Sequence, residues 1–78
     1  MQLQLYSRPG CSLCDDARRT LQMVQQDISF TYEEINIEQY PVLHERFCLM
    51  IPVVEKDGHI LQYGHIDYVT ILEALEDN

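Results

Sequence analysis

Two cysteines that stand two residues apart are the side chains of this sequence best suited to chemistry. They belong to the segment Cys11-Ser12-Leu13-Cys14, and a cysteine thiolate either attacks disulfides or binds metal ions. A structural zinc site usually takes four ligands from two such pairs, and the chain has no second pair. We therefore expect a redox pair without a metal. The alternatives are two inert buried thiols, or a metal or iron–sulfur cluster that two chains share through Cys11.

The place of the pair at the start of a helix favours a reactive thiolate. Pro9-Gly10 marks a turn, and apolar residues then recur with helical spacing from Cys11 to about Gln26. The first N–H groups of a helix lack internal partners, and the helix dipole adds positive charge there. We therefore expect the pKa of Cys11 to lie below that of a free cysteine. Cys11 is the expected nucleophile, and Cys14, one turn further on and shielded, is expected to resolve the mixed disulfide.

Three charged residues near Cys11 are expected to modulate this effect. Arg8 is always charged and favours a nearby thiolate. Asp15 and Asp16 suit the first turn of a helix, but their charge disfavours a thiolate. The sequence therefore predicts a modest lowering of the Cys11 pKa.

The rest of the sequence predicts the elements that position the pair. Alternating or β-branched apolar residues indicate strands, and helical spacing, Pro41 and Asp67 indicate helices and their starts. We expect strands over Gln2–Tyr6, Phe30–Ile37, Ile51–Glu55 and His59–Tyr63, and helices from Cys11, from Pro41 and after Asp67. Asp57-Gly58 predicts a hairpin between the last two strands. The order β-α-β, α, β-β-α indicates an α/β fold with a four-stranded mixed sheet and three helices, in a single domain over residues 1–78.

The second expected strand changes its apolar parity. Phe30 and Tyr32 alternate, and Ile35 and Ile37 then alternate on the opposite parity. Since successive side chains of a strand point to opposite faces, we expect a bulge or a strand end near Glu33-Glu34.

Composition narrows the class of partner. The chain has 78 residues, with 13 acidic against 5 basic residues and a formal net charge of −8. This charge disfavours nucleic acid and acidic membrane surfaces, which need a basic patch. No apolar run is long enough for a membrane span, and the start of the chain does not resemble a signal peptide. We expect a cytoplasmic monomer.

The motifs together resemble the thioredoxin fold, and within it the glutaredoxins. The resemblance is closest to a group of short bacterial glutaredoxin-like proteins and covers nearly the whole chain. It is carried by Leu5-Tyr6-Ser7-Arg8-Pro9-Gly10-Cys11-Ser12-Leu13-Cys14, by Ile51-Pro52-Val53-Val54, and by the Asp57-Gly58 hairpin.

The resemblance implies roles for five further residues. Pro52 would be a cis-proline that faces the cysteines, and Ile51 would offer its backbone N–H and C=O to an extended substrate. Arg8 stands where glutaredoxins often carry a lysine. Gly64 and Asp67 fall where glutaredoxins bind the γ-glutamyl end of glutathione at a helix start. The chain departs from the family there, with Tyr63-Gly64 in place of a Gly-Gly pair and Ile66-Asp67 in place of two adjacent acids.

The remaining cysteine, the histidines, the tyrosines and the acidic end are expected to take no part in the chemistry. We expect Cys48 to be a small buried apolar residue, the three histidines to be surface residues, and the tyrosines to serve packing. The acidic end is expected to fray, because acids are unfavourable at a helix C-terminus. The residues concerned are His44, His59, His65, Glu73, Glu76 and Asp77.

The expected function is that of a dithiol–disulfide oxidoreductase of glutaredoxin-like type, with a role in cell redox homeostasis. It would reduce disulfides of proteins or of glutathione, with glutathione or a reductase as electron donor and no other cofactor. The alternatives are a non-catalytic binding module, a metal or iron–sulfur carrier, and a redox sensor.

Overall fold

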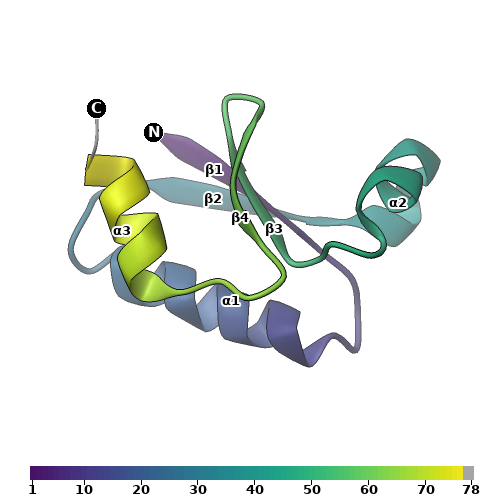
Figure 1. Ribbon diagram of the computed structural model, residues 1–78, viewed down its shortest axis with the longest axis horizontal. Helices are drawn as coiled ribbons and strands as arrows, with labels where there is room; N and C mark the ends of the chain where they lie inside the picture. Colours follow the sequence, from purple (N-terminus) through teal and green to yellow (C-terminus); the bar gives the residue numbers. More distant parts are fainter. Residues whose placement is uncertain (77–78) are drawn as a thin grey trace.

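A computed structural model describes residues 1–76, and its strands form one sheet in the order β2-β1-β3-β4 (Figure 1). β1 (Gln2–Ser7) is parallel to β2 (Thr31–Asn36) and antiparallel to β3 (Val53–Lys56), which pairs antiparallel with β4 (His59–Tyr63). The helices are α1 (Ser12–Val24), α2 (Pro41–Phe47) and α3 (Tyr68–Glu76), with a short 3-10 helix η1 (Ile37–Gln39) before α2. Over the described residues, the α/β fold with a four-stranded mixed sheet and three helices is the one expected.

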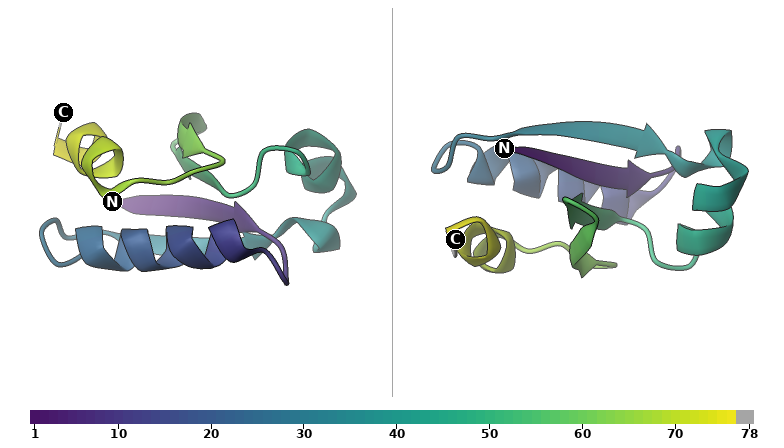
Figure 2. Two further views of the ribbon diagram at one scale, coloured as in Figure 1. Left: turned by 60° about the horizontal axis from the view of Figure 1, so that its bottom comes forward. Right: turned by 90° about the horizontal axis from the view of Figure 1, so that it is seen from above.

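The main core cluster lies between one face of the sheet and the helices α1 and α3 (Figures 1 and 2). Leu3 and Leu5 of β1 both point to this face, because alternate residues of a strand share a face. The apolar stripe of α1 meets them with Ala17, Leu21 and Val24, all fully buried. Three residues of the stripe that predicted the helix are thus buried, whereas the fourth, Leu13, is exposed.

A second core cluster lies on the opposite face, toward the end of the sheet where α2 is placed (Figure 2). It consists of Tyr6, Ile37, Phe47 and Val53. The rings of Tyr6 and Phe47 are 4.7 Å apart, and the Arg46 guanidinium lies 4.7 Å from the Phe47 ring centre. Both sheet faces are therefore partly covered by apolar contacts.

The expected bulge or strand end at Glu33-Glu34 is wrong. β2 pairs with β1 in unbroken register, from Gln2 with Thr31 to Ser7 with Asn36. The parity changes because each face of β2 has its own apolar neighbours. Tyr32 packs against the main core cluster and Ile35 against the second.

The irregularity of the sheet lies in β3, where the register with β4 shifts between Val54 and Glu55. The hairpin that follows turns at the expected residues. Asp57 and Gly58 both have positive φ, at 50° and 81°, as a two-residue turn of this kind requires.

The sheet brings the two conspicuous motifs to one end of the molecule. Tyr6 pairs with Val53, so the segment that leaves β1 and the segment that enters β3 lie at the same end of these two central strands. The first segment continues into the two cysteines and the second contains Ile51-Pro52. Strand pairing alone thus places the cysteine pair and the proline at the same end of the sheet.

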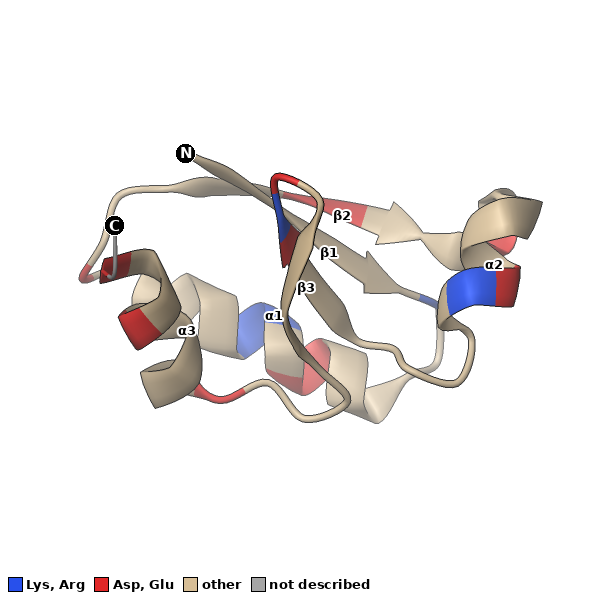
Figure 3. Ribbon diagram, turned by 45° about the horizontal axis from the view of Figure 1, so that its top comes forward, with Lys and Arg blue, Asp and Glu red and all other residues tan. Residues whose placement is uncertain are grey.

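Acidic residues occur on the strands, the hairpin and all three helices (Figure 3). Lys and Arg stand singly or in one pair, at Arg8, Arg18, Arg19, Arg46 and Lys56. No described helix has the length and apolar character that a membrane span requires.

Candidate redox site

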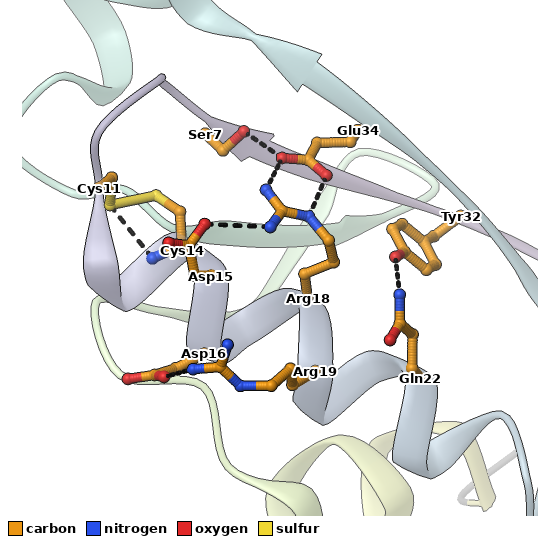
Figure 4. Close-up of polar contacts among 10 residues, drawn as sticks. All are labelled: Ser7, Cys11, Cys14, Asp15, Asp16, Arg18, Arg19, Gln22, Tyr32 and Glu34. Carbon is orange, nitrogen blue, oxygen red and sulfur yellow. Dashed lines mark hydrogen bonds and ion pairs between the residues drawn. A yellow bond between two sulfur atoms is a disulfide. The ribbon is translucent and has the colours of Figure 1, made fainter.

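The two cysteines form a disulfide at the start of α1 (Figure 4). Their Cα atoms are 5.2 Å apart. Cys11 directly precedes the helix and is partly exposed, whereas Cys14 lies in its first turn and is fully buried. The expected difference between an accessible and a shielded sulfur is therefore confirmed.

The sulfur of Cys11 occupies the capping position of α1. The backbone N–H of Cys14 donates to Cys11 Sγ at 3.1 Å. Cys11 itself has extended backbone geometry, and the preceding Gly10 has φ +75°, which admits the turn into the helix. A charged acceptor forms a stronger bond with such an N–H than a neutral one, so this contact favours the thiolate of Cys11.

The acids of the first turn are not isolated charges. Asp15 accepts from Arg18 Nη1 at 3.0 Å, and Asp16 forms an ion pair with Arg19. Each pair spans three residues of one helix, a spacing at which side chains meet. The negative charges of Asp15 and Asp16, which were expected to oppose the thiolate, are therefore offset by Arg18 and Arg19. The spacing of these pairs is visible in the sequence.

Arg18 also connects α1 to β2. Its Nε and Nη2 donate to the two carboxylate oxygens of Glu34, at 2.8 and 2.6 Å, and the Ser7 hydroxyl donates to Glu34 at 2.8 Å. The hydrogen bonds from Arg18 are the main reason that the pKa of Glu34 is lowered. Sequence reasoning missed this contact, because nothing local links residues 18 and 34.

The peptide bond between Ile51 and Pro52 is cis, and Pro52 is fully buried. Its carbonyl accepts from the Gly64 N–H at 2.8 Å. Gly64 has φ +80°, a backbone conformation that favours glycine. Pro52 is thus buried within the segment that enters β3, and the hydrogen bond from Gly64 holds that segment in place.

The expectation that Ile51 offers a free N–H to a substrate is wrong for this conformation. The N–H of Ile51 donates to the carbonyl of Phe47 at 3.1 Å, as the chain leaves α2. The side chain of Ile51 is partly exposed beside the second core cluster.

Asp67 caps α3, as expected, and its polar groups are already engaged. The carboxylate accepts from the N–H and the hydroxyl of Thr70, both at 2.9 Å, and from Gln62 Nε2 at 2.6 Å. Gln62 Oε1 in turn accepts from the Asp67 N–H at 2.9 Å. These bonds, that from Gln62 foremost, lower the pKa of Asp67. The amide that would bind an anion at this helix start is thus satisfied by Gln62.

Arg8 lies at the rim of an open hollow of about 380 Å³. Arg8 is exposed and has no ion pair within residues 1–76. The hollow is lined by Ser7, Arg8, Pro9, Gly10, Asp15, Arg18, Glu34 and Asn36. A free cation thus stands three residues before Cys11, as the sequence suggested.

A family described as "Glutaredoxin-like domain (DUF836)" matches residues 2–76. The chain belongs to this glutaredoxin-like family. No match was found among curated proteins.

Solved structures agree with the family assignment. The chain is similar to a structural-genomics target protein from X. campestris, with 26% identity, a TM-score of 0.81 and 97% of each chain covered. It is also similar to protein Ne2328 from Nitrosomonas europaea, with 28% identity and a TM-score of 0.78 over 90% of this chain and 85% of that one. Thioredoxin 1 from Thermosipho africanus shares the fold, with 16% identity and a TM-score of 0.62 over 99% of this chain and 97% of that one. The glutaredoxin-like protein therefore has a thioredoxin fold, and its close cysteine pair supports a redox function.

One buried acid of this glutaredoxin-like domain was not anticipated. Glu55, three residues after Pro52, is 7% exposed, and its Oε1 accepts from the Tyr6 hydroxyl at 2.9 Å. Its Oε2 is buried without a hydrogen-bond partner among the described residues. Burial, and then the bond to Glu55, raise the pKa of Tyr6 to about 12. The alternating apolar pattern of the strands gave no sign of this pair.

The remaining thiol and imidazole groups of the glutaredoxin-like domain do not gather at the cysteine pair. Cys48 is a free, partly buried thiol at the second core cluster, close to the apolar role expected for it. The histidines are exposed, as expected, at positions 44, 59 and 65. No group of three or more His, Cys, Asp or Glu suited to a metal occurs in residues 1–76. Of the acidic end, Glu73 and Glu76 belong to α3, while Asp77 lies outside the described residues.

Proposed function

We propose that this protein is a dithiol–disulfide oxidoreductase that reduces disulfides of other polypeptides. The observation that carries the proposal is the pairing of the capping sulfur of partly exposed Cys11 with the sulfur of fully buried Cys14 at the start of α1. An accessible thiolate and a shielded second thiol are the two parts that a thiol–disulfide exchange requires.

The proposed reaction has two steps. In the first, the Cys11 thiolate attacks one sulfur of a substrate disulfide, forms a mixed disulfide and releases the other substrate sulfur as a thiolate. In the second, Cys14 loses its proton and attacks Cys11 Sγ, which releases the second substrate thiolate. The substrate gains two electrons and the Cys11–Cys14 disulfide forms. An external thiol reductant, either glutathione or the dithiol of a reductase, then returns two electrons to the pair.

The substrate is proposed to bind beside the Ile51-Pro52 segment. The Ile51 carbonyl would accept from an extended polypeptide, the Ile51 side chain would contact it, and buried Pro52 would fix the shape of the segment. Exposed Leu13, between the cysteines, adds apolar surface next to Cys11. Arg8 would favour the thiolate by its charge.

A polypeptide disulfide is favoured over glutathione by the state of the backbone donors. The N–H groups of Ile51, Gly64 and Asp67 all donate within the protein. Gly64 and Asp67 would therefore act in substrate binding only through shape, and glutathione is proposed as reductant rather than as tightly bound ligand. We further propose that the protein acts as a monomer in the cytoplasm without nucleic acid or membrane.

Trapping of the mixed disulfide tests the proposal. Cys14→Ser lacks the resolving thiol, so it is expected to accumulate a covalent adduct with a disulfide-bonded polypeptide at Cys11, identified by peptide mass spectrometry. Cys48→Ser is the matched control and should turn over without an adduct. An adduct at Cys14 in Cys11→Ser, with none at Cys11 in Cys14→Ser, would reverse the two roles. No turnover of any disulfide by the wild-type protein would refute the enzyme.

A further inference from the structure

Arg18 stands at the centre of a polar network beside the loop that carries Cys11 (Figure 4). Three nitrogens of its guanidinium donate to two acids, Asp15 and Glu34, and Glu34 also accepts from Ser7. The network thus joins the end of β1, the middle of β2 and the first turns of α1. Residues of these segments line one open hollow together with the loop of residues 8–10, which leads into Cys11.

The geometry of the network distinguishes it from an ordinary surface ion pair. Arg18 binds Glu34 through two parallel hydrogen bonds, an arrangement that guanidinium forms and an ammonium group does not. The Glu34 side chain is 30% exposed, and Ser7 is 4% exposed. By contrast, Arg19 and Asp16 are 67% and 60% exposed and form a pair within one helix. The neighbouring pair therefore provides an internal control.

The charges of Asp15 and Arg18 affect how favourable the Cys11 thiolate is. Asp15 follows Cys11 by four residues at the same end of α1, and an uncompensated carboxylate there would make a thiolate less favourable. Arg18 reaches back from the next turn and places its positive charge on Asp15. The bond to Glu34 holds the guanidinium in that position from the other side.

We propose that Arg18 is a positioning residue for the redox pair, which fixes the start of α1 against β2 and offsets the Asp15 charge that would otherwise oppose the Cys11 thiolate. This inference rests on the proposed function, since its consequence is the reactivity of Cys11.

The test is the pH profile of Cys11 alkylation in the reduced full-length protein. Peptide mass spectrometry distinguishes Cys11 from Cys14 and Cys48. For Arg18→Gln we expect the Cys11 pKa to rise by about half a unit, which slows alkylation roughly threefold below the pKa. Arg18→Lys keeps the charge but cannot form the two parallel hydrogen bonds to Glu34, so it should recover only part of the wild-type profile. Arg19→Gln, the matched control, removes the same charge from a more exposed pair, and it should raise the Cys11 pKa less than Arg18→Gln does.

Variants of Asp15 test the claim without disturbing the bridge to β2. The Asp15 side chain is 55% exposed, so Asp15→Asn should fold normally. We expect the Cys11 pKa to fall in this variant, because a negative charge is removed and Arg18 remains. The double variant Asp15→Asn/Arg18→Gln should lose most of the rise seen in Arg18→Gln alone.

The proposal is overturned if Arg18→Gln leaves the Cys11 profile unchanged, if Arg19→Gln shifts it equally, or if the double variant keeps the full rise. Should Arg18→Gln fail to fold, the direction of the Asp15→Asn shift decides, and a rise or no shift overturns the proposal. Alkylation does not require turnover. A wild-type protein that reduces no disulfide would therefore refute the proposed function and leave the result for Arg18 intact.

Discussion

The starts of α1 and α3 use the same capping geometry with different atoms. At α1 the Cys11 sulfur accepts from the N–H three residues later, and at α3 the Asp67 carboxylate accepts from the N–H of Thr70. The Asp67 oxygens accept further hydrogen bonds from Gln62 and Thr70, whereas the sulfur of Cys11 accepts no other hydrogen bond within residues 1–76. One helix start is therefore closed by its own chain, and the other presents a nucleophile.

This difference explains why only one of two similar positions is a candidate for chemistry. A helix start stabilises negative charge wherever it occurs. At α3 the Asp67 carboxylate accepts from the helix start, and the Asp67 N–H donates to Gln62. At α1 the acceptor is the Cys11 sulfur, an atom whose charged form is also its reactive form. The cap thus contributes to stability at α3 and to reactivity at α1.

Replacement of Cys11 should give the largest effect, because Cys11 is both the proposed nucleophile and the cap of α1. Two substitutions separate its contribution to reactivity from its contribution to stability. Cys11→Ser and Cys11→Ala should both lose disulfide reduction by at least about a hundredfold. Serine is a good cap and alanine is not, so only Cys11→Ala should melt lower than the reduced wild type, by about 5 °C. Turnover of a disulfide-bonded polypeptide and thermal denaturation with reductant present measure the two quantities. Equal melting temperatures of the two variants would show that the cap at α1 is not stabilising.

Replacement of Asp67 is expected to lower stability by a similar amount, without an effect on the reactivity of Cys11. Asp67→Ala removes the acceptor of three hydrogen bonds, so the melting temperature should fall by about 5 °C or more. Asp67→Asn retains an oxygen for the Thr70 N–H and should fall less. The alkylation profile of Cys11 serves as the comparison with α1. A shift of that profile in Asp67→Ala would mean that the two helix starts are coupled.

Gln62→Ala should have a smaller effect, because it opens the start of α3 without removing its cap. Two side-chain hydrogen bonds to Asp67 are lost, and the Asp67 N–H is exposed. We expect the melting temperature to fall by a few degrees. If Gln62 closes this position to anions, glutathione should protect Cys11 from alkylation better in Gln62→Ala than in the wild type. Equal protection in the two proteins would show that Gln62 does not exclude the ligand.

Local patterns were sufficient for most of the fold. The stripe of Leu13, Ala17, Leu21 and Val24 predicted α1, and three of these residues form its buried face. Asp57-Gly58 predicted the hairpin and Asp67 the cap of α3, because turns and caps depend on residues near one another in sequence. The parity change in β2 was misread, since a single strand does not reveal that both its faces are covered.

The candidate site was predictable only where it is local. The asymmetry of Cys11 and Cys14 follows from their positions in one helix turn. The contacts of Arg18 with Glu34 and of Tyr6 with Glu55 join residues far apart in the chain. The donors that were expected to bind substrate, at Ile51, Gly64 and Asp67, are engaged by partners that tertiary structure supplies. Hydrogen-bond satisfaction is a property of the folded chain, so spacing and composition do not reveal it.

The smallest predicted effect is on the pH dependence of stability, which should differ between the starts of α1 and α3. The pKa of Asp67 is lowered from its ordinary value of 3.8, chiefly by the bond from Gln62, so its stabilising contribution is present above pH 3.8 and is lost as the pH falls through the folded-state pKa. A lowered Cys11 pKa has the same sign at higher pH: the reduced protein should gain stability from the folded-state pKa of Cys11 up to that of a free thiol, about 8.5. Denaturation of the reduced wild type and of Cys11→Ser, measured from pH 3 to pH 9, should therefore differ in slope only in the upper range. Parallel curves throughout would mean that folding does not lower the Cys11 pKa, and the contrast between the two caps would then rest on their hydrogen bonds alone.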